Sequence, residues 1–356
     1  MVTKKIFIEE NTLEEWESYF EKIGEKKFRA KQLFIAIHSQ QVGDLNDITT
    51  ISKDLREELK KEFHQKTLSL ANVQTSQQKT ELEGETTNKK VKKYLFKLND
   101  GFSIEAVWLP FENRNSVCIS VQKGCNLDCS FCATGKIPFR GNLTAAEIVA
   151  QVYYLQKDNN ERVDNVVFMG MGEPFYNYDN SIKAAYLLND KNGLNIGARH
   201  ITISTSGVLP GIEQFVENEV PFNLALSLHC VDSEKRLKLM DIEASYPLKM
   251  IIEYLKNHRD KLKQNQLTIE YIMLKDFNMG KDDVTSLAWV AKELKAKVNL
   301  IPLNTNFGGY KRPLEADMEN FWQSLQRKKV LVFNRRSPGR DIDGACGMLA
   351  GSKTIV

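Results

Sequence analysis

The 356-residue sequence contains no apolar stretch long enough to cross a bilayer, and its first ten residues carry two lysines and two glutamates rather than a signal-peptide core. We therefore expect a cytoplasmic protein without a membrane segment. Charge of one sign is not in excess either, because 49 Lys and Arg against 46 Asp and Glu leave a net charge of +3. This balance excludes a general polycation, so any contact with nucleic acid must come from local basic patches.

Cysteine is also scarce, with six residues in the whole chain. In a cytoplasmic protein such cysteines are more typical of metal binding or catalysis than of a disulfide framework. The hydrophobic content of 42% is nevertheless high enough to build a sizeable core, which argues against global disorder.

From residue 115 onward, short β-branched runs alternate with amphipathic helical patterns. Repeated βα units pack as a parallel sheet, so we predict an α/β protein built on a partial (β/α)6 barrel. In such a barrel the chemistry lies where strands end and loops begin. The expected strands are 116–121, 165–169, 201–205, 223–228, 267–274 and 298–302, and the helices between them include 144–156, 181–188, 247–262 and 282–294.

Three segments flank the barrel, which we assign to residues 115–310. Residues 1–70 show short amphipathic patterns and form a small helical accessory domain. Residues 71–114 are predicted to be a linker with a β-hairpin, and residues 311–356 a C-terminal extension. The hairpin strands are expected at 93–97 and 102–109, and the extension's helix and strand at 318–326 and 330–333.

The clearest chemical motif is C-x3-C-x2-C, formed by Cys125, Cys129 and Cys132 in the loop after the first barrel strand. Three neighbouring thiolates cannot all pair as disulfides, but they suit zinc or an iron–sulfur cluster. Three cysteines on a four-iron cluster leave one iron open for another ligand. Structural zinc with Cys118 as fourth ligand is the alternative, although zinc sites more often use two C-x2-C pairs.

The cysteine spacing, with an aromatic residue before the last cysteine, resembles the signature of the radical S-adenosylmethionine (SAM) superfamily. Further motifs follow in order: 119–125, 168–174, 204–207, 226–229 and 341–347. From about Phe28 to Gly351 the series resembles the RlmN/Cfr family of RNA adenine methyltransferases. The resemblance implies a [4Fe-4S] cluster on Cys125, Cys129 and Cys132, and two SAM molecules per turnover.

The resemblance also implies two catalytic cysteines. Cys346, in a glycine-rich loop that we expect to be mobile and exposed, would accept a methyl group from the first SAM. A 5′-deoxyadenosyl radical from the second SAM would then abstract hydrogen, and the methylene radical would add to the adenine carbon. Cys118 would help remove the adduct proton and release the RNA through a transient disulfide with Cys346. Glu105 would be a proton acceptor, and a solvated strand carboxylate is the competing interpretation.

The resemblance further implies a set of SAM contacts at the strand ends. Each of these residues alone could have a structural role, such as capping a helix. Because all of them are expected at one barrel mouth, a shared ligand is favoured. Cys230 has no counterpart in the family, so we interpret it as a buried thiol without a role. The expected SAM contacts are Gly172, Glu173, Ser204, Ser227, Leu228, His229 and Asn304.

The implied substrate is an adenine in 23S ribosomal RNA, with tRNA as a possible second substrate. Pro174 and the pair Ile301-Pro302 resemble the branch that methylates C2 more than the Cfr-like branch that methylates C8. At three positions the sequence differs from the residue that is more common in the family: Thr305 replaces Pro, Gly344 replaces Ala and Met348 replaces Gln. Several local basic groups could bind phosphates, although each taken alone is more typical of a solvated face. They are residues 53–61, 89–93, 327–329, 335, 336 and 340.

The resemblance implies an electron donor such as flavodoxin or ferredoxin, and we expect a monomer. Two other functions remain open from the residues alone. One is a radical SAM enzyme acting on a peptide or small molecule, although such enzymes often carry more C-terminal cysteines. The other is a zinc-dependent RNA-binding module without catalysis.

Overall fold

The computed structural model describes residues 5–78, 80–82, 85–87, 89–304, 307–335 and 337–350. Thr305, Asn306, Arg336 and Gly351, which the sequence motifs include, lie outside these ranges. Among the helices in the described ranges, none combines the length and apolarity that a membrane span requires.

One sheet of ten strands organises the molecule, in the order β1-β4-β5-β6-β9-β10-β11-β12-β13-β14. Strands β6 to β14 of this sheet run parallel, as the sequence predicts, and the predicted α/β class is confirmed. The C-terminal strand adds a seventh member to the six expected ones. The parallel strands are β6 (Asn115–Cys118), β9 (Asn165–Phe168), β10 (Ile201–Thr205), β11 (Asn223–Ser227), β12 (Leu267–Met273), β13 (Lys297–Pro302) and β14 (Val332–Asn334).

The hairpin predicted within a linker is part of this sheet. Strands β4 (Lys92–Leu98) and β5 (Ser103–Pro110) pair antiparallel, and β5 also pairs antiparallel with β6. The edge strand β1 (Leu68–Thr75) pairs with β4 where we expected the end of a helical domain and an exposed linker. Most of β1 is exposed, and a bulge between Leu70 and Asn72 interrupts its pattern, so it lacks the regular apolar alternation that identifies a strand from sequence. Two small antiparallel sheets are separate from the ten-stranded sheet: β2 (Thr80–Leu82) pairs with β3 (Glu85–Thr87), and β7 (Gln122–Lys123) pairs with β8 (Gly141–Asn142) across the cysteine loop.

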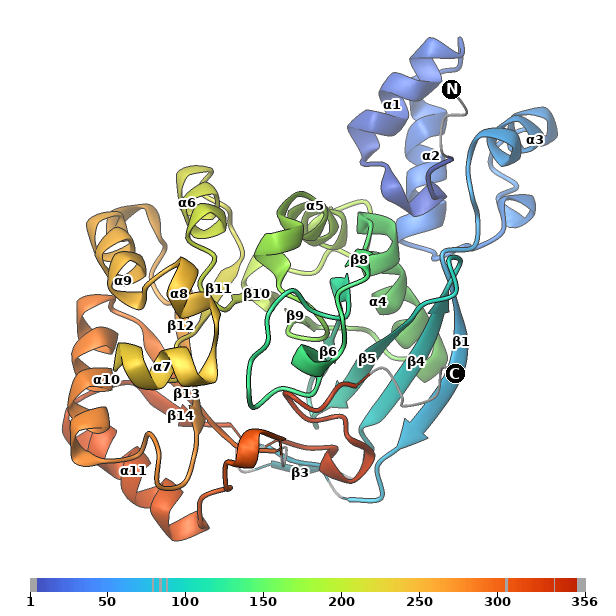
Figure 1. Ribbon diagram of the computed structural model, residues 1–356. Helices are drawn as coiled ribbons and strands as arrows, with labels where there is room; N and C mark the ends of the chain where they lie inside the picture. Colours follow the sequence, from blue (N-terminus) through green and yellow to red (C-terminus); the bar gives the residue numbers. More distant parts are fainter. Residues whose placement is uncertain are drawn as a thin grey trace.

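Helices connect the parallel strands (Figure 1). The four predicted between strands are confirmed within a few residues, and Thr144 forms the capping box that its sequence indicates. Three others were not predicted, two of them because they are too short to show a helical period. The expected helices are α4 (Ala145–Asn159), α5 (Tyr178–Asn189), α9 (Leu248–Asn257), α10 (Lys281–Glu293) and α11 (Glu315–Arg327), and the unpredicted ones are α6 (Leu209–Glu217), α7 (Ser233–Leu239) and α8 (Ile242–Ser245).

The N-terminal helices α1 (Leu13–Lys22), α2 (Lys27–His38) and α3 (Lys53–Glu62) extend from one edge of the barrel (Figure 1). Their apolar sides pack together as part of the same hydrophobic cluster as the barrel, and within it Trp16 and Phe63 lie with ring centroids 4.8 Å apart. The expected stripe of α3 is confirmed, because Leu55 and Leu59 are buried. His38 Nδ1 lies 2.6 Å from the Tyr153 hydroxyl of α4 and connects this unit to the barrel.

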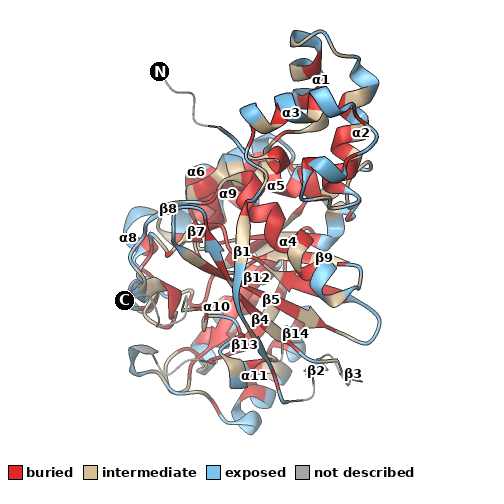
Figure 2. Ribbon diagram, turned by 90° about the vertical axis from the view of Figure 1, so that its right-hand side faces the viewer, coloured by how far each residue is buried: buried red, intermediate tan, exposed pale blue. Residues whose placement is uncertain are grey.

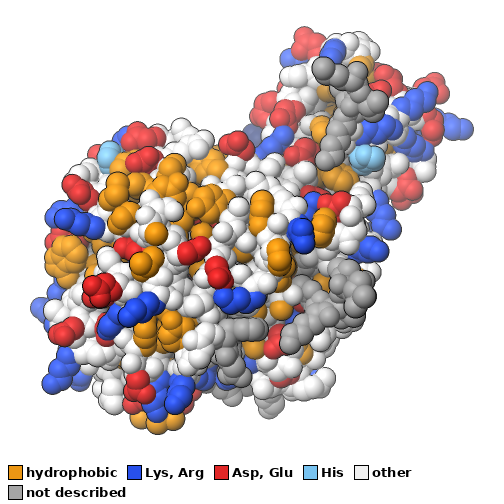
Figure 3. All heavy atoms as spheres, viewed as in Figure 1, with side chains coloured by type: hydrophobic (Ala, Val, Ile, Leu, Met, Phe, Trp, Pro, Cys, Tyr) orange, Lys and Arg blue, Asp and Glu red, His pale blue; other side chains and the backbone are white. Residues whose placement is uncertain are grey.

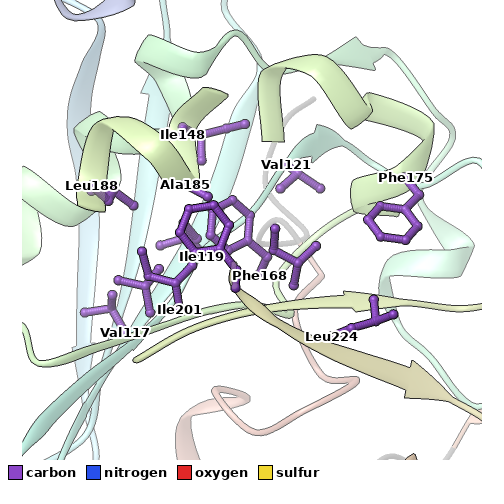
Figure 4. Close-up of a cluster of buried hydrophobic side chains, with 14 of the residues drawn as sticks. Val117, Ile119, Val121, Ile148, Phe168, Phe175, Ala185, Leu188, Ile201 and Leu224 are labelled. Carbon is purple, nitrogen blue, oxygen red and sulfur yellow. The ribbon is translucent and has the colours of Figure 1, made fainter. Parts of the chain in front are cut away.

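The main core lies between the sheet and the helices that cover it. Figure 2 shows buried residues along the strands and on the helix sides that face them. Phe168 of β9, Ile201 of β10 and Ile119, which directly follows β6, pack against Ala185 and Leu188 of α5 (Figure 4). This packing fixes the strands laterally, so that their carboxyl ends form one rigid rim.

Candidate active site

A cavity opens at the carboxyl ends of the parallel strands, where a barrel of this type carries its chemistry. The cysteine loop and the C-terminal loop complete its walls. It brings together residues that are far apart in the chain and that the sequence analysis had singled out. The predicted site residues that line it are Cys118, Cys125, Cys129, Cys132, Gly172, Glu173, Ser204, Ser227, His229 and Cys346.

The three motif cysteines form one wall of the cavity. Burial raises the pKa of Cys125 to about 12 and that of Cys129 well above its usual value, and the neighbouring Cys132 thiol adds to both shifts. A thiol that binds iron loses its proton, and the positive charge of the metal would offset the burial that keeps these thiols protonated without it. Within the part of the chain that the structure describes, no three His, Cys, Asp or Glu side chains converge on a point suited to a single ion.

The donor set fits a cluster of several irons held on one side. Three thiols face one cavity, and the space beside them is bounded by polar side chains from other strands. Gly124 makes the tight turn into the loop with a φ of 78°, and a Cβ atom there would lie 2.4 Å from the Pro138 carbonyl oxygen. These residues would hold an iron–sulfur cluster and leave cavity space for SAM.

Gly172 and Glu173 form the next wall. Gly172 has a φ of 98°, and a Cβ atom there would lie 2.4 Å from Gln122 Cβ. The buried Glu173 carboxylate accepts hydrogen bonds from the backbone N–H groups of Phe175 at 3.0 Å and Ser206 at 2.8 Å. Burial raises its pKa, and these hydrogen bonds oppose that rise. Both oxygens are thus oriented, and the carboxylate faces a cavity in which an ammonium group could pair with it.

His229 is placed by an unusual backbone conformation, with a φ of 58°. Burial, followed by the charge of Arg236, lowers its pKa to about 3, so the imidazole is neutral. Its Nδ1 accepts a hydrogen bond from Ile272 N–H at 3.1 Å, which leaves the hydrogen on Nε2. Its ring lies edge-on to Phe131, 5.0 Å away, and so connects the end of β11 with the cysteine loop.

Ser204 and Ser227 project from neighbouring strands β10 and β11 with their hydroxyl oxygens 3.4 Å apart. Two other expected SAM contacts are not on the cavity wall. Leu228 is fully buried and donates its backbone N–H to Glu270 O. Asn304 donates to Ser337 Oγ at 2.9 Å and to the Cys346 carbonyl at 3.3 Å, so it contacts the C-terminal loop.

The Cys346 loop was expected to be mobile and exposed, and the structure corrects this picture in part. Cys346 itself is exposed toward the cavity, but the loop around it is held by several hydrogen bonds. Ala133 N–H donates to Gly347 O at 2.8 Å, and Thr134 Oγ1 donates to Leu349 O at 2.6 Å. The C-terminal loop is therefore attached directly to the cysteine loop.

The two catalytic candidates Cys118 and Cys346 share the cavity, and all six cysteines, each within the described ranges, are free thiols. Desolvation by the surrounding walls raises the pKa of Cys118 to about 12 and that of Cys346 to about 11. The positive charge of Arg335 opposes both shifts. Cys230 is buried outside this cavity.

Glu105 is not the solvated strand carboxylate that we considered. It is buried, its Oε1 lies 3.3 Å from Lys93 Nζ, and its Oε2 accepts a hydrogen bond from Ala350 N–H at 2.9 Å. It does not line the cavity, and it contacts the C-terminal loop four residues beyond Cys346.

Sequence reasoning missed Glu270 and assigned Arg335 only to phosphate binding, whereas both line the cavity. A single charge inside the apolar run 267–273 was the available signal for Glu270. The basic group 89–93 is largely paired, since Lys89 contacts Glu161 and Lys92 contacts Asp158. On α3, Lys and Arg side chains are interspersed with acidic ones (Figure 3).

The barrel, its three-cysteine loop and this cavity define a radical SAM enzyme. The family model of the radical SAM superfamily matches residues 119–288. A radical SAM methyltransferase from Sphaerobacter thermophilus has a crystal structure that matches with a TM-score of 0.89 and 32% identity, covering 98% of this chain and 100% of that one.

The chain belongs to the RlmN family. The model of the ribosomal RNA large subunit methyltransferase N-terminal domain matches residues 9–64. A protein of Leptospira interrogans described as a probable dual-specificity RNA methyltransferase RlmN is 42% identical, over 98% of this chain and 96% of its own length. A protein of the same description from Geobacillus kaustophilus is 41% identical, over 95% of this chain and 90% of its own length. Because the chain belongs to this family, we no longer interpret it as a zinc-dependent RNA-binding module or as a radical SAM enzyme acting on a peptide or small molecule.

Proposed function

We propose that this protein methylates C2 of an adenine base in 23S ribosomal RNA, using Cys346 as methyl carrier and Cys118 to release the product. The observation that carries the proposal is that one cavity holds both thiols together with the three motif cysteines and five of the seven expected SAM contacts, namely Gly172, Glu173, Ser204, Ser227 and His229. The relatives' description as dual-specificity RNA methyltransferases supports an RNA substrate, and tRNA is the second substrate to test.

Carbon C2 of adenine is electron-poor and has no available lone pair, so it cannot displace a methyl group from SAM directly. A bound cluster and two SAM molecules supply the methyl group and, with one electron from a flavodoxin- or ferredoxin-type donor, a radical that abstracts hydrogen. The protein must therefore hold the methyl group beside both the radical and the base. Cys346 is suited to this role because it is exposed toward the cavity, and because a hydrogen bond attaches its loop to the cysteine loop.

The proposed reaction begins on Cys346. Its thiolate takes the methyl group from the first SAM, so that an S–CH3 bond forms on Cys346 as the sulfonium S–CH3 bond breaks and S-adenosylhomocysteine leaves. Loss of one hydrogen atom leaves a methylene radical on Cys346, and this radical forms a carbon–carbon bond to C2. The adduct then gives up one electron, which the oxidised cluster held by Cys125, Cys129 and Cys132 would accept, and the C2 proton, which Cys118 helps to remove, so the ring regains aromaticity.

Release follows by thiol–disulfide chemistry. The Cys118 thiolate attacks the Cys346 sulfur, the S–CH2 bond breaks, and the freed carbon takes up a proton to become the methyl group. A Cys118–Cys346 disulfide remains, and an external dithiol reductant must reduce it before the next turnover. Arg335 assists because its charge favours the thiolate form at both positions.

The base must leave its stack to reach this cavity, so the target is a single-stranded or splayed-out adenine. Glu173, Ser204, Ser227 and His229 are proposed to orient SAM, with Gly172 providing the close approach. Asn304 and Glu105 are assigned instead to holding the C-terminal loop, from the contacts that each makes.

Mass spectrometry of nucleosides from 23S rRNA and tRNA of cells with and without this protein tests the proposal. We expect 2-methyladenosine to depend on the protein; 8-methyladenosine would assign it to the C8 chemistry, and no change in either would overturn the proposal. In vitro, Cys346→Ala should abolish methylation and the covalent RNA adduct, and Cys118→Ala should accumulate the adduct. Cys230→Ala is the matched control, because that thiol lies outside the cavity.

A further inference from the structure

Glu270 presents an unused acceptor to the active-site cavity. It lies on β12, is 3% exposed and lines the same cavity as Cys118 and Cys346. Its Oε1 accepts a hydrogen bond from Asn299 Nδ2 at 2.9 Å, and Asn299 is its register partner on β13. Its Oε2 is buried and has no hydrogen-bond partner among the residues that the structure describes. The Asn299 contact therefore fixes the carboxylate and leaves one oxygen free.

An unpaired buried carboxylate oxygen is costly, because it loses its hydration without gaining a donor. The other buried carboxylate of the cavity, Glu173, has no such gap, since each of its oxygens accepts a backbone N–H. Of these two carboxylates only Glu270 has an unpaired oxygen, and a hydrogen-bond donor on a bound ligand would remove the cost of burying it.

Arg335 supplies the complementary group. Its backbone N–H donates to Leu300 O, next to Asn299 in β13, so the residue lies close to the Glu270 end of the cavity. Its side chain contacts the Met169 sulfur, a weak acceptor, at 3.5 Å. Across the described ranges it forms no ion pair within 4.0 Å. An acceptor and a donor therefore remain available in the same cavity.

Both groups also lie near the reacting sulfur. Arg335 and Glu270 shift the pKa of Cys346 in opposite directions, Arg335 lowering it and Glu270 raising it. The base that receives carbon from Cys346 must lie against that sulfur, and hence within reach of these two side chains.

We propose that Glu270 Oε2 accepts a hydrogen bond from the exocyclic amino group of the target adenine while Arg335 donates to a ring nitrogen. The inference rests on the proposed function and deepens it by naming the residue that selects the base. Adenine carries a donor, N6–H, beside ring-nitrogen acceptors, which matches the acceptor and donor of the pair. Guanine and inosine carry an oxygen at this position, which would face the carboxylate oxygen and be repelled.

The test compares two RNA stem-loops that differ in one group. The reconstituted holoenzyme is given the same RNA with either adenine or purine, which lacks the amino group, at the target position. Burial raises the pKa of Glu270 and the charge of Arg335 opposes that rise. A hydrogen bond to the ionised carboxylate corresponds to a preference of roughly 10- to 100-fold in kcat/KM. We expect wild type to show this preference for adenine and Glu270→Ala to reduce it to within about threefold.

Two further variants make the result independent of folding problems. In Glu270→Gln, Asn299 holds the amide oxygen and an NH2 group faces the cavity, so the preference for adenine should also be lost. Glu147→Gln removes a buried carboxylate of the α4 capping box, outside the cavity, and should keep the wild-type preference. Methylation of Cys346 by SAM alone, measured as a mass increase without RNA, shows that each variant is folded and binds SAM.

The outcomes separate the two proposals. If wild type methylates no RNA, the proposed function fails. If it methylates adenine but Glu270→Ala keeps the full preference over purine, only the role of Glu270 is overturned. A carboxylate that instead holds the hydroxyl groups of the SAM ribose would weaken SAM binding about tenfold in Glu270→Ala and leave base preference unchanged, and this result also overturns the assignment.

Discussion

Arg236 and Glu243 form a buried ion pair behind the strand ends that line the cavity, with side chains 0% and 5% exposed. Arg236 also donates hydrogen bonds to the backbone carbonyls of Ser206 at 2.7 Å and Leu228 at 3.1 Å. One guanidinium therefore connects the ends of β10 and β11. These two segments carry the N–H group that orients Glu173 and the turn that places His229.

Removing Arg236 should damage both stability and the SAM site. Arg236→Ala leaves the Glu243 carboxylate buried without its cation, and we expect a loss of about 3–5 kcal/mol in the free energy of unfolding. The double variant Arg236→Met/Glu243→Leu removes both charges and should recover most of that stability. It lacks the donors to the strand ends, so its Kd for SAM should stay raised by about tenfold. Urea unfolding and calorimetric SAM titration check this, and a double variant with wild-type SAM affinity would contradict the positioning role.

Gly172→Ala should affect the same site through backbone conformation. The φ of 98° disfavours any side chain, and a Cβ atom would lie 2.4 Å from Gln122 Cβ. Gln122 Oε1 accepts the Glu173 N–H, so displacing Gln122 also displaces the carboxylate. We expect a loss of about 1–3 kcal/mol in stability and a weaker SAM complex, measured by thermal melting and SAM titration.

Gly43→Ala is the matched control for this substitution, because a Cβ atom there would meet open space and its φ is not in the left-handed region. It should leave the Kd for SAM unchanged. Equal effects of the two substitutions would show that Gly172 has no special part in the cavity.

The sequence predicts the parallel strands well because each is a β-branched run followed by a helix with its own period. It predicts Cys125, Cys129 and Cys132 for a different reason, since their spacing alone indicates a metal centre. The expected strand ends at 205 and 302 coincide with those of β10 and β13. These features are local, so a single chain segment contains the whole signal.

Features that depend on distant partners could not be predicted. The exposed edge strand β1 has no regular apolar alternation, because a bulge after Leu70 interrupts it and the strand is defined by pairing with β4. The glycine-rich Cys346 loop has the composition of a mobile segment, yet Thr134 and Asn304 hold it through contacts that no local pattern records. Glu270 looks like one charge in a strand until Asn299 and the cavity are placed around it.

Glu105 is expected to act by holding the Cys346 loop, and two substitutions separate this role from proton transfer. Glu105→Gln keeps an oxygen that can accept the Ala350 N–H, whereas Glu105→Ala does not. If Glu105 positions the loop, Glu105→Gln should keep its rate of RNA methylation within a few-fold of wild type. Glu105→Ala should lose about tenfold or more of that rate and should also methylate Cys346 itself more slowly. Single-turnover assays with and without RNA measure the two steps. If Gln and Ala are equally inactive on RNA while Cys346 is methylated normally, proton acceptance is the correct role.

Glu9 should make the stability of the N-terminal unit depend on pH. It is buried in the 3-10 turn Ile8–Glu10, where its Oε2 accepts a hydrogen bond from Thr67 Oγ1 at 2.8 Å. Burial, opposed by its hydrogen bonds and assisted by the charge of Glu10, raises its pKa from 4.5 to about 7. The native state therefore binds this proton more tightly than the unfolded chain does. Its contribution to stability is fully present below pH 4.5 and is lost as the pH rises toward 7.

Glu9→Gln keeps an acceptor for Thr67 but cannot ionise, so it should be more stable than wild type at pH 8. A shift from 4.5 to about 7 corresponds to about 3 kcal/mol at pH 8 and to less than about 1 kcal/mol at pH 5. Urea unfolding of both proteins at the two pH values measures this difference. Glu253→Gln, on the exposed side of α9, is the control and should show no such change with pH. A Glu9→Gln advantage that is equal at pH 5 and pH 8 would mean that the stabilisation comes from packing rather than from ionisation of the buried carboxyl group.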